Sequence, residues 1–344
     1  MNTDVTRSIW LAALAAGIVV ACGDVDKAEL VEVLAADVSN DSPLAGGAVL
    51  SDSDVRRAGL FEISTEGRDN GCGAIVLSTS GINSETWLLS SAHCFDGAVA
   101  PGECRFEGTL SRVLSGDRTF LSGRNAGEVC VSPDFVAGPN RHDFATVRFP
   151  FGVSVEAPDG TLVQEYRRPI QGANPLVLSG GRIRAAVFGS GGSSGGEYDR
   201  TCGQAPRTDD DTFRYGTGLV ESEGRGTIQI DQIDGGATRV LQGDSGAPWM
   251  SALRYSSPSL SQYLDDGLVV GVNSLVQCKA LGVTSDVDYN ATSTWGDKNT
   301  SFLAERMGGE LAVVWNTSWI RTCFANWCEY TDVEKASLIT ASVL

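Results

Sequence analysis

From about Ala58 onward, short apolar stretches of the chain are separated by turn residues. Strands are predicted at Gly59–Ile63, Cys72–Thr79, Thr86–Ser90, Glu128–Val131, Phe144–Phe149, Leu176–Leu178, Arg182–Phe188, Gly218–Glu221, Thr227–Ile230 and Gly267–Ser274. No long segment with helical periodicity interrupts them, and the first helix of this region is expected only at Ser301–Met307. After Ser274 the sequence becomes polar and irregular. The pattern therefore predicts an all-β protein.

The N-terminal end has a different pattern. The apolar run Ile9–Ala21 follows Arg7 and is too short to span a bilayer, so residues 1–22 are predicted to contain an export signal. The small residue before Cys22 resembles the lipobox of bacterial lipoproteins, in which the cysteine is acylated and becomes the new N-terminus. A plain secretory signal cut after Ala21 is the alternative. Either process predicts export, to the bacterial cell envelope with a lipid anchor or as a secreted protein. The acidic residues 23–43 then form a linker or pro-segment.

Composition narrows the range of partners and cofactors. The 344 residues suffice for one large domain or two packed lobes, and 43 acidic against 26 basic residues give a formal net charge of -17. Such a surface repels phosphate backbones and anionic lipids, so we expect no nucleic-acid partner and no membrane contact except through a lipid anchor. Of nine cysteines, removal of Cys22 leaves eight, an even set that pairs in an oxidising compartment. No metal or cofactor is expected, because no zinc-like cysteine and histidine spacing or calcium-binding loop is present.

The candidate chemistry centres on Ser245, which lies in the tight turn Gly243–Pro248. A serine hydroxyl is a weak nucleophile at neutral pH and requires a base and an orienting acid. The chain has only two histidines, and His93 ends a predicted strand in the sequence Ser-Ala-His-Cys. Asp143 starts another predicted strand, where it can be buried against an imidazole. The second histidine, His142, is predicted to be structural because consecutive strand residues point to opposite faces.

The Ser-Ala-His-Cys, His-Asp-Phe-Ala-Thr-Val and Gly-Asp-Ser-Gly-Ala-Pro blocks together resemble those of trypsin-like, chymotrypsin-fold serine peptidases. Their order and spacing agree with that family, and the resemblance covers roughly Leu44–Met307. It implies two packed six-stranded antiparallel β-barrels, at about residues 44–165 and 166–307, and a short C-terminal helix. Residues 308–344 would be a C-terminal extension that packs against the body.

The resemblance also implies the roles of the site residues. Ser245 would attack the scissile carbonyl, His93 would serve as the general base, and Asp143 would orient the imidazole. The backbone N–H groups of Gly243 and Ser245 would form the oxyanion hole.

Two pairings among the eight cysteines are predicted, and the other pairings stay open. Cys72 and Cys94 match the family's bridge that clamps the histidine loop. Cys104 and Cys130 are expected to pair because they lie on neighbouring predicted strands.

An activation step is also implied by the resemblance. Leu44-Ala45-Gly46-Gly47 resembles the Ile-Val-Gly-Gly segment that becomes the new N-terminus in animal members of the family. Cleavage after Pro43 would free the Leu44 ammonium to pair with Asp244. The alternative is an unprocessed surface turn, for which paired glycines are common.

The predicted specificity pocket departs from the trypsin pattern. Arg239 replaces the aspartate six residues before the serine and Leu241 replaces the cysteine four before it, which disfavours cleavage after Lys or Arg. Ser274, which matches the family serine near the catalytic acid, and Val276 would complete the pocket, with the valine narrowing its mouth as in elastases. Small apolar side chains and acidic ones paired with Arg239 are two candidates. An Arg239 that points to solvent is the alternative.

The predicted function is that of a monomeric serine endopeptidase with a protein or peptide substrate. Two other classes compete with it. A binding protein could keep the fold without catalysis, and an esterase could use the same nucleophile, since acyl chemistry is shared.

Overall fold

The structure is a computed structural model. It describes residues 47–65, 71–81, 84–114, 117–121, 126–138, 141–177, 183–190, 194–195, 207–208, 212–224, 226–236, 238–240, 243–255, 257–280, 285–295 and 297–314. The predicted signal segment with Cys22, the linker, Leu44, Leu241 and residues 315–344 lie outside the described residues.

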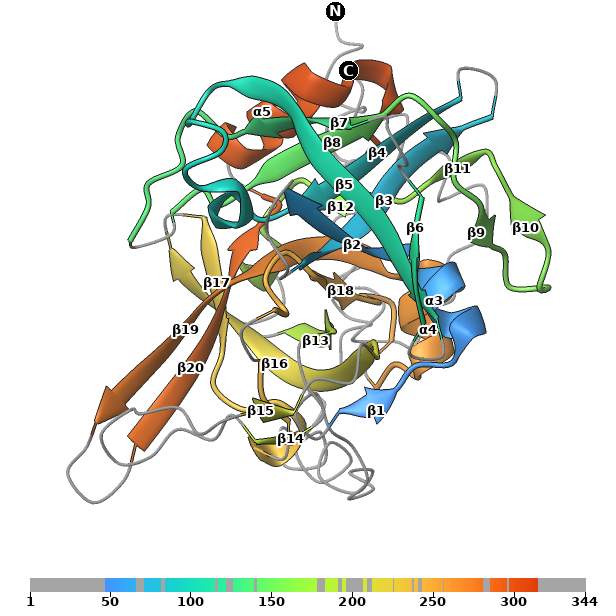
Figure 1. Ribbon diagram of the computed structural model, residues 1–344. Coiled ribbons are helices and arrows are strands. Elements are labelled where there is room, and N and C mark those ends of the chain that lie inside the picture. The colour runs from blue at the N-terminus through green and yellow to red at the C-terminus, as the bar shows by residue number, and fades with distance from the viewer. Residues whose placement is uncertain are drawn as a thin grey trace, which may run out of the picture.

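Six antiparallel strands close the first barrel, which lies uppermost in Figure 1. In order around the barrel they are β3 (Cys72–Ser80), β2 (Leu60–Thr65), β5 (Cys104–Leu114), β7 (Gly127–Val131), β8 (Ala145–Phe149) and β4 (Glu85–Ser90). β4 pairs again with β3, which completes the ring. Three short additions are β6 (Asp117–Phe120) on β5, β11 (Tyr166–Arg167) on β3, and the separate pair β9 (Val155–Glu156) and β10 (Leu162–Val163).

A second closed ring of six antiparallel strands lies below it in Figure 1. Its strands are β13 (Ile183–Gly189), β16 (Arg214–Gly224), β17 (Thr227–Ile230), β20 (Ser285–Ser293), β19 (Leu268–Ala280) and β18 (Pro248–Ser251). The short strands are β1 (Ala48–Val49) on β16, β12 (Ile170–Gln171) beside β19, β21 (Val313–Val314) on β12, and the pair β14 (Ser194–Gly195) and β15 (Arg207–Thr208). The predicted all-β class with two six-stranded barrels is confirmed.

Apolar burial explains how the two barrels meet. One apolar cluster fills the first barrel, with residues such as Leu88 and Val129, and a second fills the other, with residues such as Trp249. A third cluster lies between the barrels and includes Phe144 and Ala247. Burying one such large side chain contributes about 1.5–3 kcal/mol. Because Phe144 follows Asp143 and Ala247 lies just after Ser245, this third cluster places both segments at the junction.

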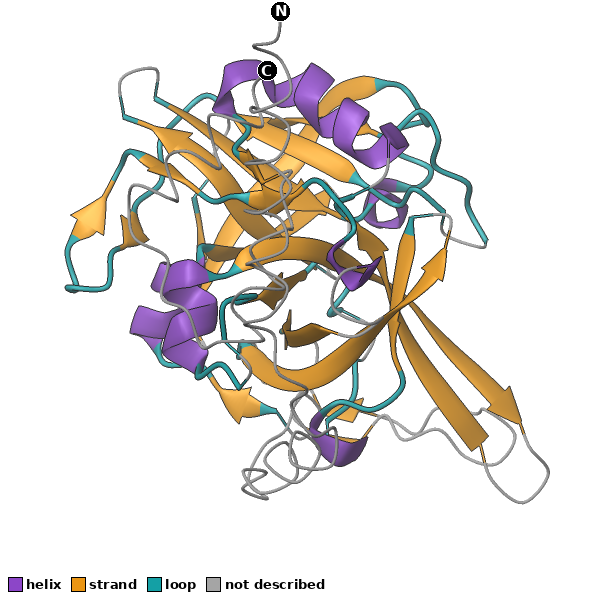
Figure 2. Cartoon of the chain, turned by 180° about the vertical axis from the view of Figure 1, so that it is seen from behind, coloured by secondary structure: helices purple, strands orange, loops and turns teal. Residues whose placement is uncertain are grey.

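The helices correct the expectation that helix begins only at Ser301. α5 (Asp297–Met307) starts earlier, and two seven-residue helices, α3 (Asp52–Ala58) and α4 (Leu260–Asp266), precede it. Both short helices begin at a serine whose hydroxyl accepts a backbone N–H, in a capping box completed three residues later. At seven residues they are too short to show a helical apolar period, so the cap was their only local signal. Figure 2 shows α3 and α4 next to each other and α5 on the first barrel.

Two further predictions about where strands occur are wrong. Leu176–Leu178 was expected to be a strand, but Pro175–Val177 is a short 3₁₀ helix, η2. The region after Ser274 was expected to be irregular, but β19 continues to Ala280 and pairs with β20. In Figure 1 this hairpin projects from the second barrel. In the described part of the chain its outer portion, from Gln277 opposite Asp288 to Ala280 opposite Ser285, pairs only with itself.

The chain crosses between the barrels close to the predicted boundary. β11 pairs with β3 of the first barrel, and β12 pairs with β19 of the second, so the crossing lies between Arg167 and Ile170. The predicted extension begins as part of the body, because β21 pairs with β12. None of the described helices is long and apolar enough to cross a membrane.

Both predicted disulfides are present and confirmed. Cys72 and Cys94 are bonded with a Cα–Cα distance of 6.2 Å. Cys104 and Cys130 are directly opposite each other in the β5–β7 ladder, 4.1 Å apart at Cα, and are also bonded. Disulfides of this kind form in oxidising compartments, which agrees with an exported protein.

Candidate active site

His93 lies in a short 3₁₀ helix, η1 (Ala92–Phe95), that follows β4 directly. Its neighbour Cys94 is bonded to Cys72 at the start of β3, so a covalent link ties the helix to the adjacent strand. Ala92 and Phe95 are buried, whereas the His93 side chain keeps 25 % of its surface exposed. The imidazole is therefore held in place on a buried helix and still reaches solvent.

Asp143 orients that imidazole from a fully buried position. Its Oδ2 lies 2.7 Å from His93 Nδ1, and its Oδ1 accepts the backbone N–H of His93 at 2.8 Å. The hydroxyl of Ser274 also donates to Oδ2, at 2.5 Å. Three donors compensate for the loss of hydration of this buried carboxylate. When Nδ1 donates to the carboxylate, the lone pair of the neutral ring is on Nε2, the nitrogen that can accept a proton.

Ser245 is half-buried in a turn that requires glycine on both sides. Gly243 has φ 101° and Gly246 has φ 79°, values at which a side chain would strain the backbone. A Cβ added to Gly246 would also overlap Ser90 Oγ and the Gly73 carbonyl. The turn therefore packs directly against the ends of β3 and β4.

Gly73 links the serine turn to the histidine loop. Its N–H donates to the Ser245 carbonyl at 2.7 Å, and its own carbonyl accepts from Ser90 Oγ at 2.8 Å. Gly73 adjoins Cys72, whose disulfide partner adjoins His93. The structure thus brings the segments of all three predicted catalytic residues to the junction between the barrels.

Asp244 is buried, and its carboxylate lies against Gly189, where an added Cβ would overlap Oδ1. Arg214 of β16 pairs with Gly189 on one side and with Val49 of β1 on the other. Val49 of β1 therefore lies two strands away from Gly189 in the sheet. The Leu44 ammonium itself lies outside the described residues, so its pairing with Asp244 stays a prediction.

The predicted specificity residues occupy three different environments. Arg239 is half-buried and follows Thr238, whose hydroxyl donates to Asp234 Oδ2 at 2.8 Å. Val276 is half-buried against the core of the second barrel. Ser274 uses its hydroxyl on Asp143, so its side chain supports the acid.

His142 contacts a residue outside the candidate site, and its conformation differs from the predicted one. It precedes β8 in a turn, with a left-handed φ of 50°, and is not a strand residue. Its Nδ1 lies 2.7 Å from Asn299 Oδ1, in α5. A local turn, and not strand alternation, therefore separates it from its neighbour Asp143.

Sequence reasoning missed Asn273, which is buried directly before Ser274. Its side chain donates to the carbonyl of Asp244 at 3.0 Å. The available signal was one asparagine inside the apolar stretch Gly267–Ser274.

The ligand atoms of Cys104, Glu128 and Cys130 lie within 4.8 Å of one another. The two sulfur atoms are bonded to each other, so neither is a thiolate that could bind a metal.

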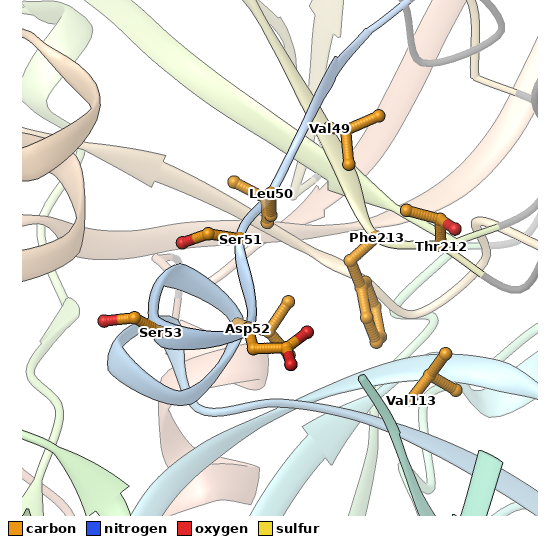
Figure 3. Close-up of a pocket in the computed structure, with 9 residues that line it drawn as sticks. Val49, Leu50, Ser51, Asp52, Ser53, Val113, Thr212 and Phe213 are labelled. Atoms are coloured by element: carbon orange, nitrogen blue, oxygen red, sulfur yellow. The ribbon is translucent and has the colours of Figure 1, made fainter. Parts of the chain in front are cut away.

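A cavity of about 530 Å³ opens beside β1 and contains none of the residues predicted for catalysis or specificity (Figure 3). Its walls come from β1, from α3 and the two residues between them, from β5, and from the two residues that precede β16. It is lined by Val49, Leu50, Ser51, Asp52, Ser53, Val55, Val113, Thr212 and Phe213.

Compared with known proteins, the chain matches no family model and none of the curated proteins.

Proposed function

We propose that this protein is a serine endopeptidase of the trypsin-like family that hydrolyses peptide bonds through an acyl-enzyme on Ser245. The observation that carries the proposal is the buried Asp143 carboxylate, which accepts from both His93 and Ser274 next to the glycine turn of Ser245. The two-barrel architecture, with the site at the junction, supports it.

In the acylation half-reaction, Ser245 Oγ attacks the carbonyl carbon of the scissile bond while His93 Nε2 takes the hydroxyl proton. The carbonyl π electrons move to oxygen, which the N–H groups of Gly243 and Ser245 stabilise. The oxyanion then collapses, the C–N bond breaks, and His93 returns the proton to the leaving amine. Asp143 stabilises the imidazolium that exists between these two proton transfers.

In the deacylation half-reaction, water replaces the amine. His93 takes a proton from the water, whose oxygen attacks the ester carbonyl through a second oxyanion. Collapse breaks the ester bond, and the proton goes back to Ser245 Oγ, which regenerates the enzyme.

Labelling with a fluorophosphonate tests the nucleophile, because the reagent forms a covalent adduct with an activated serine. We expect wild-type protein to label and Ser245→Ala to remain unlabelled. Ser251→Ala is the matched control, since Ser251 is also buried near the turn but donates to the Arg184 carbonyl. A folded, processed wild-type protein that does not label would favour a binding protein without catalysis. Labelling without cleavage of a peptide library would favour an esterase.

The same peptide library, digested by wild-type and by Arg239→Gln, tests the specificity pocket. If Arg239 pairs with an acidic side chain before the cleaved bond, the acidic preference disappears in the variant. A preference for small apolar side chains that is unchanged by the substitution would instead indicate that Val276 sets the pocket size.

Export and activation are part of the proposal. We propose that Cys22 is acylated and anchors the protein, which predicts that Cys22→Ser loses fatty-acid incorporation. We also propose that cleavage after Pro43 frees Leu44 to pair with Asp244. N-terminal sequencing of the active form should therefore begin at Leu44, and full activity of a protein still beginning at Cys22 would contradict this step.

A further inference from the structure

Asn273 is an almost fully buried amide whose hydrogen bonds allow only one orientation. Trp249 Nε1 donates to its Oδ1 at 2.5 Å, while its Nδ2 donates to the carbonyls of Phe188 at 2.8 Å and Asp244 at 3.0 Å. An indole N–H can only donate and a backbone carbonyl can only accept. The amide group therefore cannot flip without losing all three bonds.

The bond to the Asp244 carbonyl matters because that carbonyl and the Ser245 N–H belong to the same peptide unit. Peptide units are planar, and no cis bond occurs in the described residues, so the N–H points opposite to the C=O. Holding the carbonyl toward Asn273 therefore aims the Ser245 N–H away from the buried amide. This N–H is one of the two donors assigned to the oxyanion hole.

The backbone of Asn273 holds the rest of the turn. Its N–H donates to the Ala247 carbonyl at 2.8 Å, and its carbonyl accepts the Gly246 N–H at 2.8 Å. The same carbonyl accepts from Ser91 Oγ at 2.5 Å, two residues before His93. The backbone thus positions the turn against the histidine loop. The Asp244 carbonyl accepts both the Asn273 side-chain amide at 3.0 Å and the Ala247 N–H at 3.1 Å, so the side chain and the turn's own backbone orient the Asp244–Ser245 peptide together.

We propose that Asn273 is a positioning residue that preorganises the oxyanion hole by fixing the Asp244–Ser245 peptide. The inference rests on the proposed function and deepens it. An oxyanion donor must be oriented before charge develops, because reorientation during the reaction would cost part of the stabilisation. The side-chain amide provides part of that orientation, from the core of the second barrel.

The test compares wild-type with Asn273→Ala and the isosteric Asn273→Asp, which places a carboxylate oxygen against two carbonyls. Losing one oxyanion donor lowers kcat about 100- to 1,000-fold. Because the Ala247 N–H still donates to the Asp244 carbonyl, we expect a smaller loss, of about 10-fold, in both variants. KM should stay within about 2-fold, because the interaction acts in the transition state and not on bound substrate. A peptide boronate, whose tetrahedral adduct occupies the hole, should lose affinity by the same factor as kcat. A product-like peptide should bind unchanged.

Gln171→Leu is the matched control. Gln171 is also a buried amide whose Nε2 donates to two carbonyls, those of Ala173 at 2.6 Å and Val314 at 3.4 Å, and these carbonyls are not part of the serine turn. We expect it to lower the melting temperature and leave kcat unchanged.

The outcomes separate this inference from the proposed function. The positioning role alone would be overturned if the wild-type is active and its folded Asn273 variants keep the wild-type kcat. It would also be overturned if these variants lose affinity for the boronate and for the product-like peptide by the same factor. A wild-type that neither labels with fluorophosphonate nor cleaves peptides would overturn the function and the inference together. Should Asn273→Ala fail to fold, kcat and KM of Asn273→Asp decide the question. Trp249→Phe removes only the donor to the amide oxygen of Asn273, so it should lower kcat by a smaller factor and leave KM unchanged.

Discussion

Replacing Gly73 by alanine should disable the site more than it destabilises the fold. An added Cβ would lie 2.6 Å from Ala247 Cβ and 2.8 Å from both Ala247 Cα and N. Carbon atoms pack at about 3.5–4.0 Å, so the serine turn must move by about 1 Å relative to β3. A misplacement of about 1 Å can cost 100-fold in rate, or about 2.7 kcal/mol of transition-state stabilisation. Overpacking of this kind costs about 1–3 kcal/mol of folding stability.

The assay measures kcat and KM on a chromogenic peptide, together with the melting temperature, for wild-type and Gly73→Ala. Gly152→Ala is the control, because a Cβ at Gly152 would meet its nearest neighbour, Thr79 Oγ1, at 3.6 Å. We expect Gly152→Ala to match wild-type in both measurements. A Gly73→Ala protein that loses stability but keeps wild-type kcat would refute the argument that β3 sets the position of the serine turn.

Three further substitutions test other parts of the structure. Asp143→Asn should lower kcat about 10,000-fold with the fold intact, since it favours the wrong imidazole tautomer; kinetics and circular dichroism check this. Replacing Cys72 and Cys94 by serine opens a loop with a sequence separation of 22, which should cost about 3 kcal/mol in a denaturant titration and slow fluorophosphonate labelling. Tyr263→Phe removes a buried hydroxyl that has no hydrogen-bond partner among the residues that the structure describes, so chemical denaturation should show a stability gain of about 1 kcal/mol. Burial raises the pKa of Tyr263 above its ordinary 10.0, so the folded state retains the proton longer than the unfolded chain. Wild-type stability should therefore fall as pH rises past 10, and less so in the variant.

Much of the barrel framework could be predicted because strands with a buried face carry an apolar pattern. β3, β4 and β17 begin and end within a residue of the predicted stretches. The failures occurred where strands extend beyond the closed ring or where the element is too short to show a pattern. The outer part of the β19–β20 hairpin, which pairs only with itself in the described residues, is of the first kind, and the helices α3 and α4 are of the second.

The segments of the candidate site could also be found in the sequence, because a nucleophile, a base and an acid are restricted to a few residue types. The roles of Ser274 and Asn273 were harder to predict. Ser274 was expected in the specificity pocket and, by the resemblance, near the catalytic acid; the structure shows its hydroxyl donating to Asp143. Asn273 looked like one polar residue in a strand. Both contacts join positions far apart in the chain, so no local pattern reports them.

The sequence by itself determined which residues could react: one serine flanked by glycines, a histidine beside a cysteine, and an aspartate before an apolar strand. It also determined the short apolar stretches that form many of the strands, while the two-barrel arrangement was implied by the resemblance. Only the tertiary structure decided how these groups are oriented. Ser274 of β19 donates to the Asp143 carboxylate, which belongs to the other barrel, and Asn273 of β19 donates to the Asp244 carbonyl, which lies far from it along the chain. Side-chain chemistry is local to a residue, whereas the direction of a carbonyl, and of the N–H on the same peptide, depends on what packs against it.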